Sequence, residues 1–204
     1  MVANVAGNAA DQLGAYVLLA TSCDKSLATT VSFTSIRVVC QNTLGFAFED
    51  MSANRRRHIK VDHNKKFAPE SVKKSLGLID KAWSKFLTQV DPMASIPLSD
   101  SLAQKYFESL FMPADALDAK PMSVAKSREV HQMMSLFKSA FGQNTATAKG
   151  TLWGAVNAVT YYTDHVRSAK STERIDSAWF GSGAALKALA WSKAETLMEQ
   201  SAAG

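Results

Sequence analysis

The excess positive charge of this chain lies in one basic strip, Asn54–Lys66, with the sequence NRRRHIKVDHNKK. Of 23 basic and 18 acidic residues in the chain, six and one lie in this strip, so the remaining 17 of each sign cancel. Clustered Lys and Arg side chains neutralise phosphates and release counterions, which indicates nucleic acid first, and a membrane surface or an acidic protein next. The alternative is a solvated charged face. The residues expected to contact phosphate are Arg55, Arg56, Arg57, Lys60, Lys65 and Lys66, with Arg37 as a neighbour.

A second group of polar residues recurs every four positions from Trp153 through Asn157 and Tyr161 to His165, which places them along one face of a helix. In a functional interpretation His165 acts as an acid or base, Asn157 bonds a phosphate or a base edge, and Asp164 lies beside them. These three are the weak catalytic candidates. The favoured interpretation is that Asn157 and His165 are buried polar groups that fix helix packing.

Two cysteines and two histidines in the front half are the residue types that bind metals. Cys23, Cys40, His58 and His63 lack the close ligand spacing of a zinc finger or ribbon. We expect two free thiols, with Cys40 a small buried hydrophobe, and neither a metal nor a cofactor.

The segment Gly181-Ser182-Gly183 stands before a helical pattern, with Lys187 one turn later. Backbone N–H groups of such a segment can cradle a phosphate. Because it lacks both the Walker spacing and a preceding strand, close helix packing through glycine is the better interpretation.

The elements that position these residues change in kind along the chain. Alternating residues and a short polar connection predict a β-hairpin from Ala15–Thr21 and Leu27–Thr34. Apolar residues at helical spacing predict a helix over Ile36–Phe48, and alternation returns in a predicted strand, His58–Asp62.

Helical spacing dominates the rest of the chain. A long helix begins at Pro69 and carries the stripe that ends in Trp83, Phe86 and Val90, with Pro92 and Pro97 expected to break it. The further predicted helices are Asp100–Phe111 capped by Ser99, Val124–Phe141, Thr151–Val166 after the linker GQNTATAKG, Glu173–Phe180 and Ala184–Gln200.

The expected fold class is therefore α+β, with a hairpin and a basic strand packed on helices and an all-helical C-terminal half. With 204 residues and 47% hydrophobic composition, we expect a flexible leader at 1–13 and a single domain at 14–204, its mixed front at 14–91 and its helical back at 92–204. No apolar run suits a membrane span and no signal peptide is evident, so we expect a cytoplasmic protein without a membrane partner.

Three separated blocks carry a resemblance to a known family: RVVCQNTL with the preceding TSCDKS and FTSI, then GTLWGAVNAVTYYTDHVR, then AWFGSGAALK. In this order they resemble a phage- and plasmid-like family built on a conserved domain of unknown function. Members usually carry additional strands before the first block, so the chain resembles an N-terminally truncated version. Where the family tends to have His-Asp-Gly, this chain has Cys23-Asp24-Lys25, which puts in doubt any chemistry that needs the histidine.

The family's occurrence in phages and conjugative elements implies work on mobile DNA or against host defence. The expected function is a nucleic-acid-binding protein of a mobile genetic element in a bacterial host cell, with DNA as the partner and single-strand annealing or recombination as the process. The alternatives are a protein-directed inhibitor of a host nuclease or defence complex and a metal-independent enzyme. The sequence favours binding over catalysis and leaves a homo-oligomer open.

Overall fold

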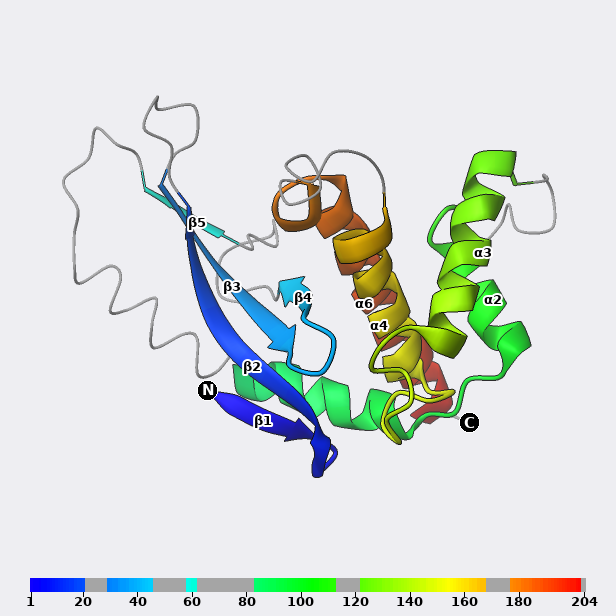
Figure 1. Cartoon of the computed structure of the whole chain (residues 1–204), viewed down its shortest axis with the longest axis horizontal. Coiled ribbons are helices and arrows are strands. Elements are labelled where there is room, and N and C mark those ends of the chain that lie inside the picture. Colours follow the sequence, from blue (N-terminus) through cyan, green and yellow to red (C-terminus); the bar gives the residue numbers. More distant parts are fainter. Residues whose placement is uncertain (21–28, 46–57, 62–82, 113–121, 168–176, 203–204) are drawn as a thin grey trace.

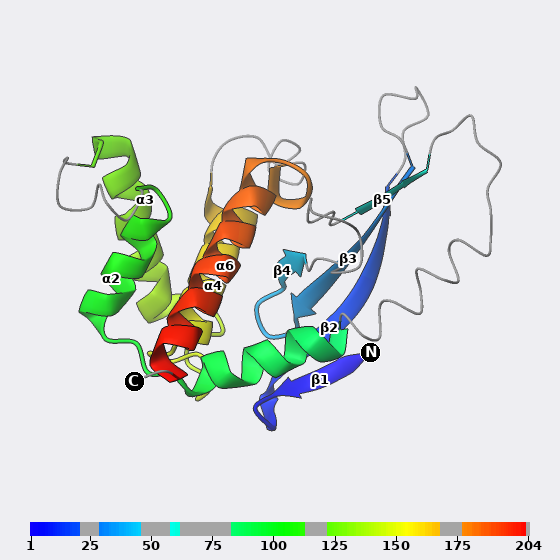
Figure 2. The same cartoon turned by 180° about the vertical axis from the view of Figure 1, so that it is seen from behind.

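The computed structural model describes residues 1–20, 29–45, 58–61, 83–112, 122–167 and 177–202. These residues form an α+β fold, in which an N-terminal antiparallel sheet is followed by helices (Figure 1). Seen from behind, the helical half stands beside the sheet, next to β4 (Figure 2). No helix in the described ranges combines the length and the apolar character needed to cross a membrane.

The sheet is built on a long hairpin. Its strands run in the order β1-β2-β3-β4, and β5 also pairs with β3. All pairs are antiparallel. β4 pairs with β3 from Thr34 to Arg37, at the end of the sheet next to the helices, which we call the inner end. β5 pairs with β3 from Thr29 to Ser32, at the opposite end, which we call the outer end. The predicted hairpin and the predicted basic strand are thus confirmed, although the hairpin connection lies outside the described residues. The strands are β1 (Val2–Val5), β2 (Asn8–Ala20), β3 (Thr29–Arg37), β4 (Asn42–Gly45) and β5 (His58–Val61).

The helix predicted over Ile36–Phe48 is wrong. β3 continues to Arg37, a turn follows with Gln41 at a positive φ of 57°, and β4 then returns along β3. The segment is rich in β-branched residues, which fit a pleated sheet better than a helix, and pairing with β3 supplies the backbone hydrogen bonds.

The flexible leader expected at residues 1–13 is also wrong. Residues 2–5 form β1, and residues 8–13 form the first half of β2. Ala6 and Gly7 join the strands with φ values of 45° and 74°, which is the backbone conformation of a tight hairpin turn. Val5 and Leu13 are buried in the core, so this segment contributes to folding.

The helical half follows the predicted order. Ser99 caps α2 as predicted, because its hydroxyl accepts a hydrogen bond from the Leu102 N–H at 3.3 Å. A π-helical turn, η2, continues α4, and residues 177–179 are helical before α6. The helices are residues 83–95, α2 (Asp100–Ser109), α3 (Val124–Ser139), α4 (Leu152–Tyr161), η2 (Tyr162–Val166) and α6 (Ser182–Ala202).

Pro92 does not break its helix, which continues to residue 95. Met93 and Ala94 beyond it are buried in the core, and this packing outweighs the one backbone hydrogen bond that proline removes. The stripe predicted from the sequence is confirmed in its described part, since Trp83, Phe86 and Val90 are buried.

The centre of the helical half is α4, whose residues Leu152 to Thr160 are all buried. It packs against α3, α6 and β4. The segment before it, expected to be a polar linker, is partly enclosed, because Gln143, Thr147 and Ala148 are buried. Polar residues at this position therefore need partners inside the protein.

Candidate functional site

The basic strip is described only where it forms β5. Register places the Lys60 backbone opposite Thr30 of β3, and Thr30 opposite Ala20 of β2. The centre of the strip therefore lies at the outer end of the sheet, at the opposite end of β3 from β4. The other residues expected to contact phosphate, Arg55, Arg56, Arg57, Lys65 and Lys66, lie outside the described residues.

Strand β2 of the hairpin carries two exposed side chains on its way toward β5. Tyr16 and Val17 of β2 are 50% and 51% exposed. Because successive side chains of a strand point to opposite faces, β2 is open to solvent on both faces at these two residues, although Thr34, opposite Tyr16 on β3, is buried. The hairpin thus presents surface to solvent between its packed inner end and β5.

Arg37, expected as a neighbour of the strip, is instead 1% exposed. Its guanidinium binds the Asp11 carboxylate with two parallel hydrogen bonds, from Nε to Oδ1 at 2.6 Å and from Nη2 to Oδ2 at 2.7 Å. Nη2 also donates to the carbonyl of Gly142 and to the Thr145 hydroxyl. A planar guanidinium suits this two-pronged pairing. Arg37 is a buried cross-link in the structure. The prediction that it contacts phosphate beside the basic strip is therefore wrong.

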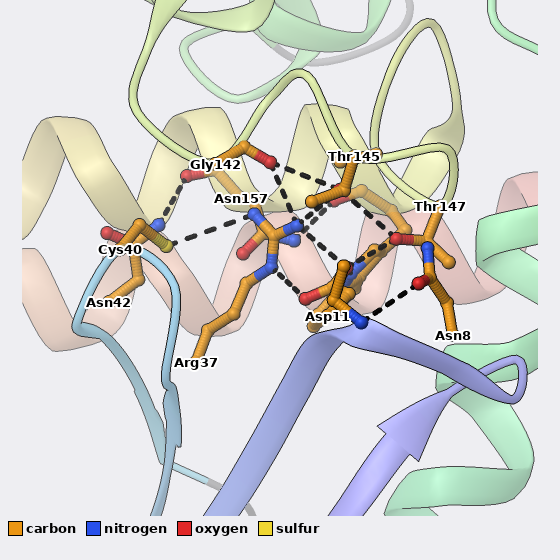
Figure 3. A network of polar contacts seen from close by, with 12 residues as sticks. Asn8, Asp11, Arg37, Cys40, Asn42, Gly142, Thr145, Thr147 and Asn157 are labelled. Carbon is orange, nitrogen blue, oxygen red and sulfur yellow. Dashed lines mark hydrogen bonds and ion pairs between the residues drawn. The ribbon is translucent and has the colours of Figure 1, made fainter.

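The carboxylate of Asp11 accepts further hydrogen bonds beside this ion pair (Figure 3). Its Oδ2 accepts from the Thr147 hydroxyl and from Nε1 of Trp153, the latter at 3.4 Å. The network joins β2 and β3 to the segment before α4 and to α4 itself. Since a buried charge is costly unless it is paired and hydrogen-bonded, these partners fix how the sheet docks on the helical half.

Cys40 lies at the edge of the same network. Nη1 of Arg37 is 3.8 Å from its sulfur, and the side chain is buried. Burial raises the pKa of the Cys40 thiol, and the Arg37 charge only partly offsets this effect. The thiol is therefore neutral and unreactive, as expected of a small buried hydrophobe.

Asn157 is buried, as the favoured interpretation predicted. Its side-chain amide donates to the backbone carbonyl of Trp153 within α4 at 2.8 Å, and its backbone carbonyl accepts from the side-chain amide of Asn42 of β4 at 3.1 Å. The Asn157 side chain is thus buried and bonded within its own helix, and the Asn42 side chain makes the bond that attaches β4 to α4.

Asp164, the second catalytic candidate, lies on η2 and faces β4. Oδ2 of Asp164 accepts from the backbone N–H and the hydroxyl of Thr43, at 2.7 Å and 2.9 Å. Nζ of Lys187 donates to Oδ1 of Asp164 at 2.8 Å and to the Thr43 hydroxyl at 2.9 Å. The Lys187 and Asp164 side chains are 3% and 7% exposed. Lys187 is thus a buried partner of Asp164, which argues against a role in a phosphate cradle.

His165, the third candidate, is exposed, so its expected burial is wrong. Its ring lies against that of Tyr161, with centroids 4.6 Å apart. Asp164 turns toward β4 and Asn157 toward the core, so the three candidates occupy three different environments and do not form one catalytic constellation.

The glycine segment before α6 packs closely, as predicted. A Cβ placed on Gly183 would lie 2.9 Å from the Ser177 carbonyl oxygen and 3.0 Å from Cα of Ala178. The Gly183 N–H also donates to the Ser177 hydroxyl oxygen at 3.1 Å. Glycine is therefore required here for the approach of two backbones.

Cys23 and His63 lie outside the described residues, and β5 carries His58. Among the residues that the structure does describe, no three His, Cys, Asp or Glu side chains gather as a metal site would require.

Several network residues were missed from the sequence: Asp11, Thr43, Thr145 and Thr147. The available signal was an Asp in a strand of the sheet's inner end and a Thr-rich segment directly before an apolar helix. A buried Arg requires a carboxylate nearby, but its partner is 26 residues away in the chain.

A sequence model of the family described as a domain of unknown function, DUF932, matches residues 2–179. No curated protein and no solved structure matches this chain. Because the match covers most of the chain, the protein belongs to the DUF932 family.

Proposed function

We propose that this DUF932 protein binds nucleic acid through the phosphate backbone, at the outer end of its sheet. The observation that supports this most is β5, the centre of the basic strip, which forms a strand of the sheet in register with β3. A strand fixes the backbone position of Lys60, at the centre of this charge run, in a way that a free loop does not, and therefore favours a binding surface over a merely solvated segment.

The charges of the body add to this argument. The buried cations Arg37 and Lys187 are neutralised by Asp11 and Asp164. The chain's net charge of +5 equals that of the strip, where six basic residues oppose one acid. A polyanion would thus be attracted to one end of the molecule rather than to its whole surface.

Binding of this kind has a defined character. Contacts to phosphate carry little sequence information, so sequence preference should be weak and the affinity should fall steeply with salt. We further propose that the nucleic acid is DNA of a phage or plasmid, and that the protein acts in recombination or single-strand annealing. This proposal draws on the resemblance of the three sequence blocks to mobile-element proteins.

The test is fluorescence anisotropy with labelled single-stranded and duplex oligonucleotides across a salt series. The binding variant carries Arg55→Glu, Arg56→Glu and Arg57→Glu. A matched control carries Lys126→Glu, Arg128→Glu and Lys138→Glu, which makes the same charge change at exposed positions of α3. Binding weakened only in the first variant supports the proposal, with the slope of log affinity against log salt reduced by about 2 on single strands and about 3 on duplex for three lost phosphate contacts.

No binding by the wild type at low salt would overturn the proposal. Capture of a host protein that competes for the strip would then favour the protein-directed inhibitor. Equal losses in both charge-reversed variants would instead indicate a general charge effect without a defined surface.

A further inference from the structure

The ring of Tyr16 leans back along β2 and covers Gly14. A Cβ placed on Gly14 would lie 2.7 Å from Cε2 of Tyr16 and 3.2 Å from both Cζ and the hydroxyl oxygen. Residues two apart in a strand share a face, so the far end of the ring rests on the strand instead of projecting away from it. Tyr16 is nevertheless 50% exposed. One part of the ring is therefore supported by backbone while the rest is open to solvent.

This ring shares a face of the sheet with the row of positions that leads to β5. Ala20, Thr30 and Lys60 occupy directly opposed register positions on β2, β3 and β5. Directly opposed positions belong to one face, and Ala20 lies an even number of residues after Tyr16 on β2. At the rise of a strand, the Tyr16 position is about 13 Å from that row.

We propose that Tyr16 is a stacking platform for an unpaired base of single-stranded DNA whose phosphates contact the basic strip. The proposal rests on the proposed function and names the substrate class. Every base offers a π-face, so stacking on an aromatic ring tolerates any sequence, in keeping with phosphate binding. The bases of a duplex are stacked on each other and are not available, so this surface selects single strands.

The absence of a side chain at Gly14 positions the ring, which provides a second and independent variant. In Gly14→Ala the new methyl group would overlap the end of the Tyr16 ring. That end is the flexible part of the side chain and can swing away, while a strand accepts alanine at least as well as glycine. Gly14→Ala should therefore displace the ring and keep the fold.

The experiment compares the affinities of four variants for a single-stranded oligonucleotide and for its duplex. Tyr16→Leu removes the ring but keeps an apolar group, and Tyr16→Phe keeps the ring. Phe141→Leu, at an aromatic residue that is exposed in the turn before α4, is the control. Circular dichroism and thermal melting check that each variant is folded.

Tyr16→Leu should weaken single-strand binding about 5- to 100-fold, with Gly14→Ala also weaker. Tyr16→Phe and Phe141→Leu should change the affinity at most about twofold, since neither removes the stacked ring. The salt slope of Tyr16→Leu should equal that of the wild type, because no phosphate contact is lost. An oligonucleotide containing 2-aminopurine should be quenched on binding the wild type and less quenched on binding Tyr16→Leu.

The results separate the two proposals. Wild-type affinity in folded Tyr16→Leu, with binding lost in the arginine triple variant, overturns stacking and leaves phosphate binding in place. Equal weakening toward single strands and duplex also overturns the platform, since a duplex offers no free base. If the wild type binds no single-stranded DNA, both the platform and the single-strand substrate are wrong.

Discussion

At the inner end of the sheet, where β4 pairs with β3, Arg37 and Lys187 are 1% and 3% exposed, and each binds a carboxylate. At the outer end, where β5 pairs with β3, the sequence gathers six basic residues against one acid, and the neighbouring hairpin is exposed at Tyr16 and Val17. The cations of the inner end are therefore paired with carboxylates inside the protein, whereas the basic residues of the strip exceed the acids beside them in the sequence.

This difference separates structural charge from charge that remains for a partner. A buried cation must be neutralised inside the protein. Its interaction with the partner carboxylate therefore holds the sheet on the helices. The six basic residues of the strip face a single acid in the sequence, and we propose that this excess charge attracts phosphate. A charged residue's type says little about its role until its burial is known.

The largest effect is expected at the inner end, for Asp11→Ala. This change leaves the Arg37 guanidinium buried without its carboxylate, and removing one partner of a buried pair costs about 3 to 5 kcal/mol of unfolding free energy. Urea denaturation followed by circular dichroism measures it. Asp100→Ala is the matched control, since its ion pair with Lys138 is exposed at both side chains and should contribute at most about 1 kcal/mol. Similar small losses in both variants would contradict the structural role of the network.

A smaller loss is expected for Lys187→Met. Asp164 would keep its two hydrogen bonds from Thr43, so the cost should be about 2 to 4 kcal/mol. In a double-mutant cycle, adding Asp164→Asn should recover part of this loss, because the uncompensated carboxylate is removed. Folded Lys187→Met should bind single-stranded DNA like the wild type. Weaker binding by the folded variant would contradict the claim that the inner end serves the fold while the outer end binds DNA.

The sequence predicted much of the secondary structure, because local signals determine it. The Ser99 cap, the stripe through Trp83, Phe86 and Val90, and the close packing at Gly183 all depend on residues that are near in sequence. The strand β4 was missed because Ile36, Val39, Thr43 and Ala47 also fit helical spacing, and only pairing with β3 decides between the two.

The inner network could not be predicted for a related reason. Asp11 of β2 bonds Arg37 of β3. Arg37 also bonds Thr145, and Asp11 bonds Thr147, and these two threonines follow α3 in the chain. Such contacts depend on the tertiary fold. The basic strip was visible at once because its residues are consecutive.

The smallest expected effect is the pH dependence due to Cys40. Burial raises the pKa of this thiol above its ordinary value of 9.0. The unfolded chain releases the proton more readily, so stability is fully present below pH 9.0 and falls as pH rises above it. Urea denaturation from pH 8 to pH 10 should show a steeper decline for the wild type than for Cys40→Ala, by about 1 kcal/mol or less per pH unit. Parallel declines would mean that Cys40 is not buried as described.

The most direct test of the contrast between the two ends is hydrogen–deuterium exchange of the wild type with and without a single-stranded oligonucleotide. The account predicts added protection in peptides from the outer part of the hairpin and from 54–66, with none in 142–167, where the buried networks lie. Protection centred on 142–167, with the outer hairpin and the basic strip unchanged, would contradict it.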